Sequence, residues 1–136
     1  MIKRINLSLD RATICHQILI QNELDRKLID EYVLEVQDQM MFSCYKDEIL
    51  VGYIAAVTTN FYSMEVKSIG VSPLFHRKKC GTMLVDAIID YARKNEFKIM
   101  MVKVESKNTN LRKFFEHVNF IPLDQVNSKM IYVLPV

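Results

Sequence analysis

The chain has 136 residues, half of them apolar and a quarter charged, and its formal net charge is +2. This length and composition indicate one globular domain with a substantial core over residues 1–136 and exclude a disordered chain. The small net charge excludes a global field that would recruit nucleic acid. The cysteines show no paired spacing, which predicts buried thiols in a reducing compartment; they are Cys15, Cys44 and Cys80.

No apolar run approaches the ~18 residues of a membrane span. The first residues also lack the long apolar stretch of a signal peptide. The three histidines share no metal-ligand spacing, so no metal site is predicted. We therefore expect a soluble cytoplasmic protein without a membrane partner.

The first third of the chain predicts a strand followed by helical structure. Residues 1–7 form a short apolar strand pattern, and apolar residues at helical spacing then run from Ile14 to Leu28. This pattern fits one helix, or two helices broken near residues 21–22. Residues 21–39 are acidic, because six carboxylates face two cations and leave a net charge of minus four.

Three strands are predicted next. Residues 40–46 and 49–57 form a hairpin around a short polar turn, and residues 64–71 follow as the third strand. Gly52 lies inside the second of these strands. A glycine at such a position predicts a bulge or a close approach of another backbone.

The stretch after the third strand predicts an anion site. Ser72 and Pro73 end the strand, residues 76–79 form a basic loop, and residues 82–95 place their apolar side chains on one helical face. The first N–H groups of a helix lack intrahelical partners and carry partial positive charge, so a pyrophosphate would fit there. Four basic residues without interleaved aromatics are otherwise typical of a solvated loop, and they do not indicate a nucleic-acid partner.

The remaining residues predict a strand, a helix and two further strands. Residues 97–104 are almost continuously apolar, as expected for a strand covered on both faces. Residues 108–117 show helical spacing, and residues 120–123 and 130–134 are strand-like. The order β, α(α), β, β, β, α, β, α, β, β indicates an α/β fold with a mostly antiparallel sheet, in which residues 64–104 add a parallel pair.

The basic loop resembles the acetyl-CoA loop of the GNAT superfamily of acyl-CoA-dependent N-acyltransferases. There a Val, often with a Pro, precedes the pattern Q/R-x-x-G-x-G/A, which opens a helix; Val71, Pro73 and Gly81 match. His76 stands where Gln or Arg is usual, and Lys79 stands where the first Gly is usual. Because glycine permits a positive φ, we expect backbone strain at Lys79 if φ is positive there, while its ammonium adds charge to the loop.

A second motif supports the same resemblance. The family pattern is an Asn after the fifth strand, followed by A-x-x-[FL]-Y-x-x-x-G-F, and the run from Asn108 keeps this spacing without a gap. The Ala, Phe/Leu, Tyr, Gly and closing Phe positions are taken by Leu111, Phe114, Phe115, Asn119 and Phe120.

The resemblance implies a GNAT-like α/β (α+β) fold. Its mixed, mostly antiparallel sheet would have six to seven strands with splayed central strands, flanked by about four helices. The implied cofactor is acetyl-CoA, whose thioester would lie between the splayed fourth and fifth strands. The implied cofactor-binding residues are Ile69, Gly70 and Val71 beside the pantetheine, His76, Arg77, Lys78, Lys79, Cys80, Gly81 and Thr82 around the pyrophosphate, and Asn108, Phe114 and Phe115 farther along the cofactor.

The resemblance also implies direct attack of a neutral amine on the thioester, with the oxyanion held by a backbone N–H at a strand bulge. Glu65 lies six residues before Val71, where histone-type members carry a catalytic glutamate, and it is the candidate general base. The alternative for Glu65 is a solvated strand carboxylate. Phe115 replaces the Tyr that usually protonates the departing thiolate, so Cys80, water or another tyrosine would have to substitute. A non-catalytic or weakly active acyl-CoA-binding module is the alternative for the whole domain.

The expected acceptor is a primary amine on a small molecule or a peptide. Residues 21–39 fall where the family's variable acceptor wall lies, and their negative charge would favour a cationic amine such as a polyamine, an aminoglycoside, or a lysine-like or N-terminal peptide amine. A solvated helix face explains the same charges equally well. Many relatives pair as dimers, which leaves a homodimer open for this chain.

Overall fold

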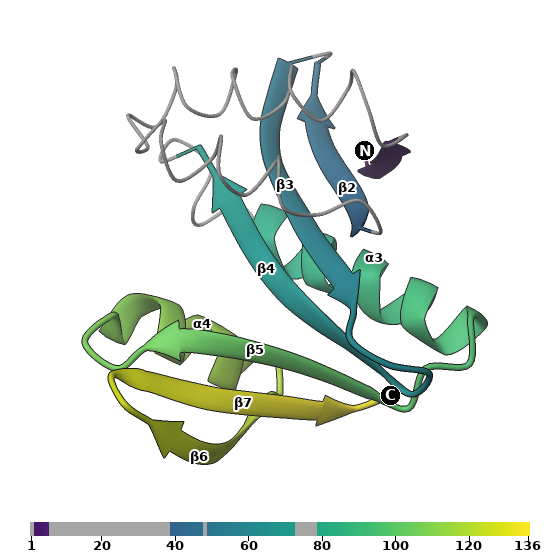
Figure 1. Cartoon of the computed structure of the whole chain (residues 1–136). Coiled ribbons are helices and arrows are strands. Elements are labelled where there is room, and N and C mark those ends of the chain that lie inside the picture. The colour runs from purple at the N-terminus through teal and green to yellow at the C-terminus, as the bar shows by residue number, and fades with distance from the viewer. Residues whose placement is uncertain (1, 6–38, 48, 73–78) are drawn as a thin grey trace.

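The computed structural model describes residues 2–5, 39–47, 49–72 and 79–136. They form one seven-stranded sheet with the strand order β1-β2-β3-β4-β5-β7-β6 and two helices (Figure 1). The elements are β1 (Ile2–Ile5), β2 (Gln39–Lys46), β3 (Ile49–Thr58), β4 (Ser63–Val71), α3 (Cys80–Lys94), β5 (Ile99–Glu105), α4 (Thr109–His117), β6 (Ile121–Val126) and β7 (Lys129–Pro135).

The sheet is mixed and mostly antiparallel, as the sequence predicts. Among the described strands, only β4 and β5 run parallel, and α3 connects them, because parallel neighbours need a long crossover. The other strand pairs of the described residues are antiparallel. The described residues hold two helices instead of the predicted four or so, and the helical segment predicted at residues 14–28 lies outside them.

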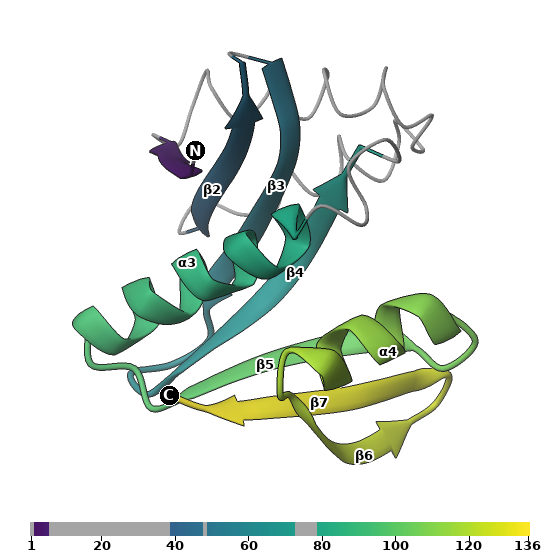
Figure 2. The same cartoon turned by 180° about the vertical axis from the view of Figure 1, so that it is seen from behind.

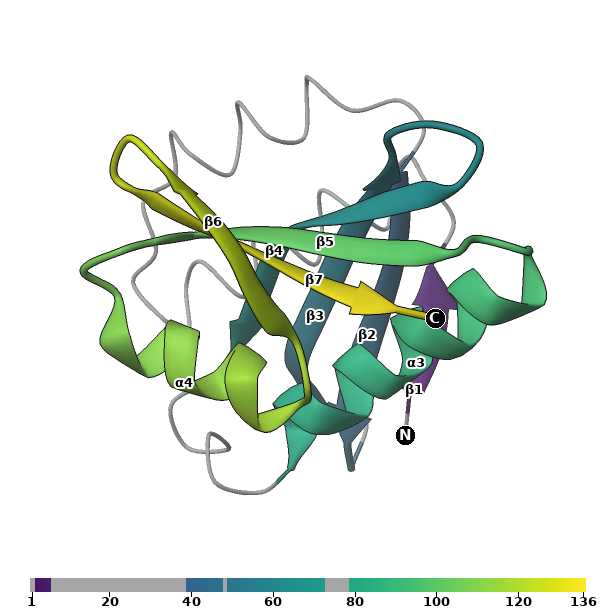
Figure 3. The same cartoon turned by 90° about the horizontal axis from the view of Figure 1, so that it is seen from below.

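Both helices lie on the same face of the sheet, α3 over β2 to β4 and α4 over β5 and β7 (Figure 2). The view from below shows them next to one another on the same side of β5 and β7 (Figure 3). The apolar face predicted for α3 is confirmed, because its buried residues are Cys80, Leu84, Val85, Ile88, Ile89 and Ala92. Neither helix of the described ranges is long and apolar enough to cross a membrane.

Gly52 allows the start of α3 to approach β3 closely. A Cβ atom at this position would lie 2.9 Å from the Sγ of Cys80 and 3.0 Å from the carbonyl oxygen of Gly70. The register between β2 and β3 shifts beside it, which makes Val51 an extra residue in β3. The predicted close approach is therefore confirmed at Gly52 itself, and the predicted bulge lies at its neighbour.

We expect Gly52→Ala to lower the free energy of unfolding by about 1–3 kcal/mol, because the added methyl group overpacks the contact with α3. The carbonyl of Gly70 belongs to the main chain and cannot rotate away. Urea unfolding measures the change. Adding Cys80→Ala removes the sulfur contact and should recover part of the loss, whereas a wild-type urea midpoint for Gly52→Ala alone would contradict the close approach.

Candidate functional site

The parallel strands β4 and β5 diverge part-way along their length. Their pairing ends at Val66 and Val102, although both strands continue. Figure 1 shows β4 and β5 close together at one end and fanning apart toward the other. Between Lys67 and Gly70, β4 has a strand neighbour among the described residues only on its β3 side. The predicted splayed strands are thus confirmed, and the main chain of β4 faces the divergence with hydrogen-bonding groups that a ligand can use.

A bulge lies at the start of the divergence. Against β3, Ala56 pairs with Val66 and Ala55 pairs with Ser68, which leaves Lys67 as the extra residue of β4. A bulge interrupts the ladder and leaves the extra residue unpaired. The main chain beside the divergence therefore has the geometry that can present an N–H group to a developing oxyanion.

Glu65 is a buried carboxylate next to this bulge. The residue is 5% exposed, which rules out the solvated strand carboxylate considered from the sequence. Its Oε2 lies 3.0 Å from the Nζ of Lys67. A carboxylate held mostly out of water beside a cation is a feature of functional sites as well as of structural ion pairs.

Glu65 shares its sheet face with a pair of hydroxyl groups. Glu65 pairs with Val57, and Ser68 pairs with Ala55, which lies two residues before Val57 in β3. Residues two apart in a strand share a face, so Glu65 and Ser68 lie on the same sheet face and point away from α3. On this face the hydroxyl groups of Tyr53 and Ser68 form a hydrogen bond. Tyr53 is 3% exposed. The sequence did not single out these two residues, because only the pairing of β3 with β4 brings them together.

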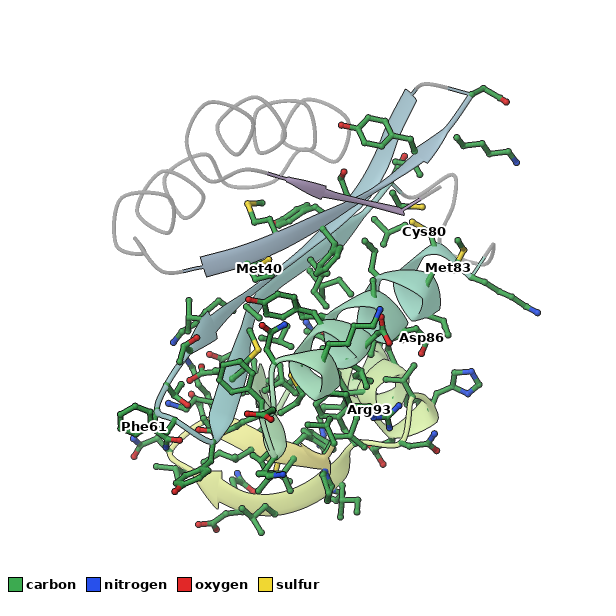
Figure 4. All side chains as sticks on the ribbon, turned by 90° about the vertical axis from the view of Figure 1, so that its right-hand side faces the viewer. Met40, Phe61, Cys80, Met83, Asp86 and Arg93 are labelled. Atoms are coloured by element: carbon green, nitrogen blue, oxygen red, sulfur yellow. The ribbon has the colours of Figure 1, made fainter. Side chains whose placement is uncertain are left out.

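Cys80 is unsuited to the role of proton donor. It is 4% exposed and packs against Gly52 inside the core. Burial and a hydrogen bond with Cys44 raise the pKa of the Cys80 thiol to about 12. The conjugate thiolate of an ordinary thiol, with a pKa of about 8.5, cannot readily take a proton from so weak an acid. Figure 4 shows Cys80 at the start of α3, directed toward the sheet, whereas Met83 and Asp86 lie on the outer side of the helix.

The two sequence motifs meet where α3 begins. A Cβ atom on Gly81 would lie 3.0 Å from Cε1 of Phe114, so the absence of a side chain lets the Phe114 ring of α4 reach the first turn of α3. Phe114 is partly buried, as are Gly81 and Thr82. The remaining loop residues of the first motif, His76, Arg77 and Lys78, lie outside the described residues. Ile69, Gly70 and Val71 are partly buried at the end of β4.

The second motif supplies a helix cap and a core aromatic. The Oδ1 of Asn108 accepts a hydrogen bond from the backbone N–H of Leu111 at 3.2 Å, so this side chain caps α4. Phe115 is 0% exposed, and its ring centroid lies 5.2 Å from those of Phe114 and Phe120. The cofactor contacts predicted for Asn108 and Phe115 stay predictions. Burial favours Phe114 over Phe115 as the aromatic that a ligand can reach.

Among the residues that the structure describes, no three His, Cys, Asp or Glu side chains gather where they could hold a metal ion.

The candidate site consists of four features. They are the diverging strands β4 and β5, the bulge with Glu65 and Lys67, the hydroxyl groups of Tyr53 and Ser68, and the start of α3 beside Phe114.

Residues 9–120 match the family model described as the acetyltransferase (GNAT) family. The chain belongs to the GNAT acetyltransferase family. Comparison with curated protein sequences gives no significant match.

Several solved GNAT structures share the fold at low sequence identity. A GNAT-family acetyltransferase from Desulfovibrio desulfuricans is 14% identical, with a TM-score of 0.83 over 99% of both chains. A GNAT acetyltransferase from Elizabethkingia anophelis with acetyl-CoA bound is 14% identical, with a TM-score of 0.79 over 100% of this chain and 97% of that one. The ribosomal-protein-S18-alanine N-acetyltransferase from Escherichia coli is 14% identical, with a TM-score of 0.79 over 99% of this chain and 94% of that one. At this identity the similarity shows the fold alone.

Two positions that are usually glycine in the GNAT motifs carry other residues in this chain. Both of these residues have a positive φ. Lys79, the N-cap of α3, has φ 63° and ψ 11°, and Asn119 has φ 75°. Asn tolerates this left-handed region, whereas a lysine side chain there costs about 1 kcal/mol or more. The strain expected at Lys79 for a positive φ is therefore present, because the backbone there adopts a conformation that favours glycine although the residue is lysine.

We expect Lys79→Gly to raise the free energy of unfolding by about 1 kcal/mol, because glycine adopts this φ without a Cβ clash. Lys79→Ala is the matched control, since it removes the same ammonium but keeps the Cβ atom. Urea unfolding of both variants separates conformation from charge. If Lys79→Ala gains as much stability as Lys79→Gly, the gain comes from the lost charge and the strain argument fails.

Proposed function

We propose that this chain transfers the acetyl group of acetyl-CoA to a primary amine of a small molecule or a peptide. The observation that carries the proposal is the divergence of β4 and β5 at a bulge, directly beside the buried carboxylate of Glu65. Membership of the GNAT family and the acetyl-CoA bound to the Elizabethkingia anophelis neighbour support the choice of cosubstrate.

In this proposal the cofactor lies along β4 and reaches the start of α3. The main chain of Ile69, Gly70 and Val71 would pair with the amides of the pantetheine arm, as an added strand would. The pyrophosphate would bind at residues 76–82, where unpaired helix N–H groups and the exposed Lys79 offer positive charge. Asn108 and Phe114 would contact the pantetheine from the α4 side.

Glu65 would act as the general base. An amine acceptor arrives as an ammonium ion, and Glu65 removes one proton so that the nitrogen lone pair can attack the thioester carbon. A main-chain N–H at the bulge would stabilise the oxyanion that forms. The C–S bond then breaks and leaves the thiolate of coenzyme A.

The thiolate lacks the usual tyrosine donor, because Phe115 has no hydroxyl group and is buried in the core. Releasing a thiolate with a pKa of about 8.5 at neutral pH costs about 2 kcal/mol, which slows turnover without stopping it. With Cys80 excluded by its burial, solvent or a tyrosine remains as the proton source. Tyr53 is the described tyrosine whose hydroxyl lies on the Glu65 face next to the bulge.

A non-catalytic or weakly active acyl-CoA-binding module is the second candidate. Two observations favour it: Phe115 cannot donate a proton, and Lys79 occupies a strained position in the cofactor loop. Such a module would retain the β4 edge and the start of α3 and would bind the cofactor without transferring its acetyl group.

The acceptor proposed from the sequence is a cationic amine attracted by the acidic side chains of residues 21–39, which run from Glu23 to Asp38 and lie outside the described residues. A peptide N-terminal amine belongs to the same class, and the Escherichia coli neighbour is named for an alanine of a ribosomal protein. Glu65 adds a further negative group on the sheet face that an ammonium would approach.

We expect isothermal calorimetry to show acetyl-CoA binding and a thiol-release assay to show turnover with one or more amines of a panel. The panel should include polyamines, aminoglycosides, lysine and short peptides. Binding without thiol release across the panel would favour the acyl-CoA-binding module. Absence of binding would contradict both candidates.

We expect Glu65→Gln to lower kcat about 10²-fold or more with the most active amine, while the Kd for acetyl-CoA stays close to that of the wild type. Asp90→Asn is the matched control, because Asp90 also pairs with a lysine, Lys94 at 2.9 Å, but lies on the exposed side of α3. Steady-state rates as a function of pH measure the effect. A Glu65→Gln enzyme with the wild-type pH–rate profile would remove Glu65 from the mechanism.

A further inference from the structure

Lys67 places a primary amine inside the candidate site. It is the extra residue of the β4 bulge and the first residue beyond the last pair of β4 with β5. Its side chain is 38% exposed, and its Nζ lies 3.0 Å from the Oε2 of Glu65. The amine is therefore close to the proposed base and at the point where the strands open.

The side chain points to the face where an acceptor would meet Glu65. Val66 packs into the core beneath α3, whereas Glu65 and Ser68 point to the opposite face. The contact with Glu65 shows that the ammonium of Lys67 reaches this second face. Lys67 thus occupies, in the protein's own chain, the position that the ammonium of an external acceptor needs in order to lose its proton to Glu65.

We propose that Lys67 is a site of acetylation by acetyl-CoA bound to the same chain. The proposal rests on the proposed transferase function and assigns to it an acceptor that is built into the fold. A tethered amine needs no separate binding step, because its orientation relative to the base is already fixed by the strand.

The reaction balances with the groups that the site contains. The ammonium of Lys67 gives one proton to Glu65, and the neutral nitrogen attacks the thioester carbon. A C–N bond forms and the C–S bond breaks. The second proton of the ammonium leaves the nitrogen as the tetrahedral intermediate collapses, and one of the two released protons neutralises the thiolate of coenzyme A. The products are Nε-acetyllysine, coenzyme A and one proton in solution.

Acetylation would also change the site for later acceptors. An acetylated lysine has no charge, so it cannot keep the ion pair with Glu65. The Oε2 of Glu65 then becomes available to an external ammonium. Acetylation therefore breaks the ion pair and frees the carboxylate of Glu65 to take a proton from an external amine. Turnover of that amine should accelerate as Lys67 becomes acetylated.

The chain provides a matched control lysine for the test. Lys94 forms an ion pair with Asp90 at 2.9 Å, but it lies at the end of α3 and its side chain is 73% exposed. Uncatalysed acetylation favours the more accessible amine, so it should modify Lys94 before Lys67. Acetylation by acetyl-CoA bound in the site should instead modify Lys67 before Lys94.

The experiment incubates the full chain with acetyl-CoA in the absence of any added amine. Peptide mapping by mass spectrometry then follows acetylation of Lys67 and Lys94 over time. We expect Lys67 to be acetylated first and at least about tenfold faster, and we expect Glu65→Gln to slow Lys67 about 10²-fold while the rate at Lys94 stays unchanged. Lys67→Arg, which keeps the charge, should abolish the signal from that peptide, whereas Lys94→Arg should leave acetylation of Lys67 intact.

Two results would overturn the inference. Acetyl groups spread over exposed lysines such as Lys94 and Lys113 in the order of their exposure would show chemical acetylation alone. An unmodified Lys67 in a protein that binds acetyl-CoA and acetylates an external amine would also refute it, and would leave the proposed function standing. A protein that does not bind acetyl-CoA by calorimetry would instead refute the proposed function and this inference together.

Discussion

The loss of pairing between β4 and β5 after Val66 and Val102 is the constraint on which the rest of the site depends. A main chain that leaves a ladder must find other partners for its N–H and C=O groups. Here the bulge at Lys67 interrupts the β3 side at the same level, so β4 changes its pairing on both edges within a few residues. An enzyme that binds an extended, amide-bearing cofactor can use that edge, and the fold provides it before any side chain is considered.

Burial then assigns different roles to residues that look similar in the sequence. Glu65 is buried on the face opposite α3 next to a cation, whereas Cys80 is buried in the core beneath α3 with its pKa raised. Both are titratable residues near the divergence. The carboxylate keeps a polar neighbour and can exchange protons with an ammonium, but the thiol is surrounded by core atoms and serves packing. Burial also distinguishes the two phenylalanines, because Phe115 is fully buried whereas Phe114 stays partly exposed.

The contact between Gly81 and Phe114 brings the two sequence motifs together in space. They are far apart in the sequence, yet a ring atom of Phe114 lies 3.0 Å from the position that a Cβ atom on Gly81 would take. The missing side chain at Gly81 makes room for this contact, because protein interiors leave little free volume. The fold also constrains the backbone at Lys79 and Asn119. Both residues have a positive φ although neither is the glycine that the GNAT motifs usually have at these positions.

The sequence by itself determined the order of the elements, the mostly antiparallel sheet and the buried face of α3, because these follow from the periodicity and the order of the segments. The resemblance of two motifs to those of the GNAT superfamily indicated the family. It also singled out Glu65 as the candidate base, and Lys79 and Phe115 as departures from the family motifs. Only the tertiary structure decided that Glu65 is buried and paired with Lys67, that Tyr53 bonds to Ser68, and that Cys80 packs in the core. These facts depend on strand register, a bulge and the approach of a helix to a sheet. Such long-range contacts leave no periodic trace in the sequence, because the partners belong to different segments.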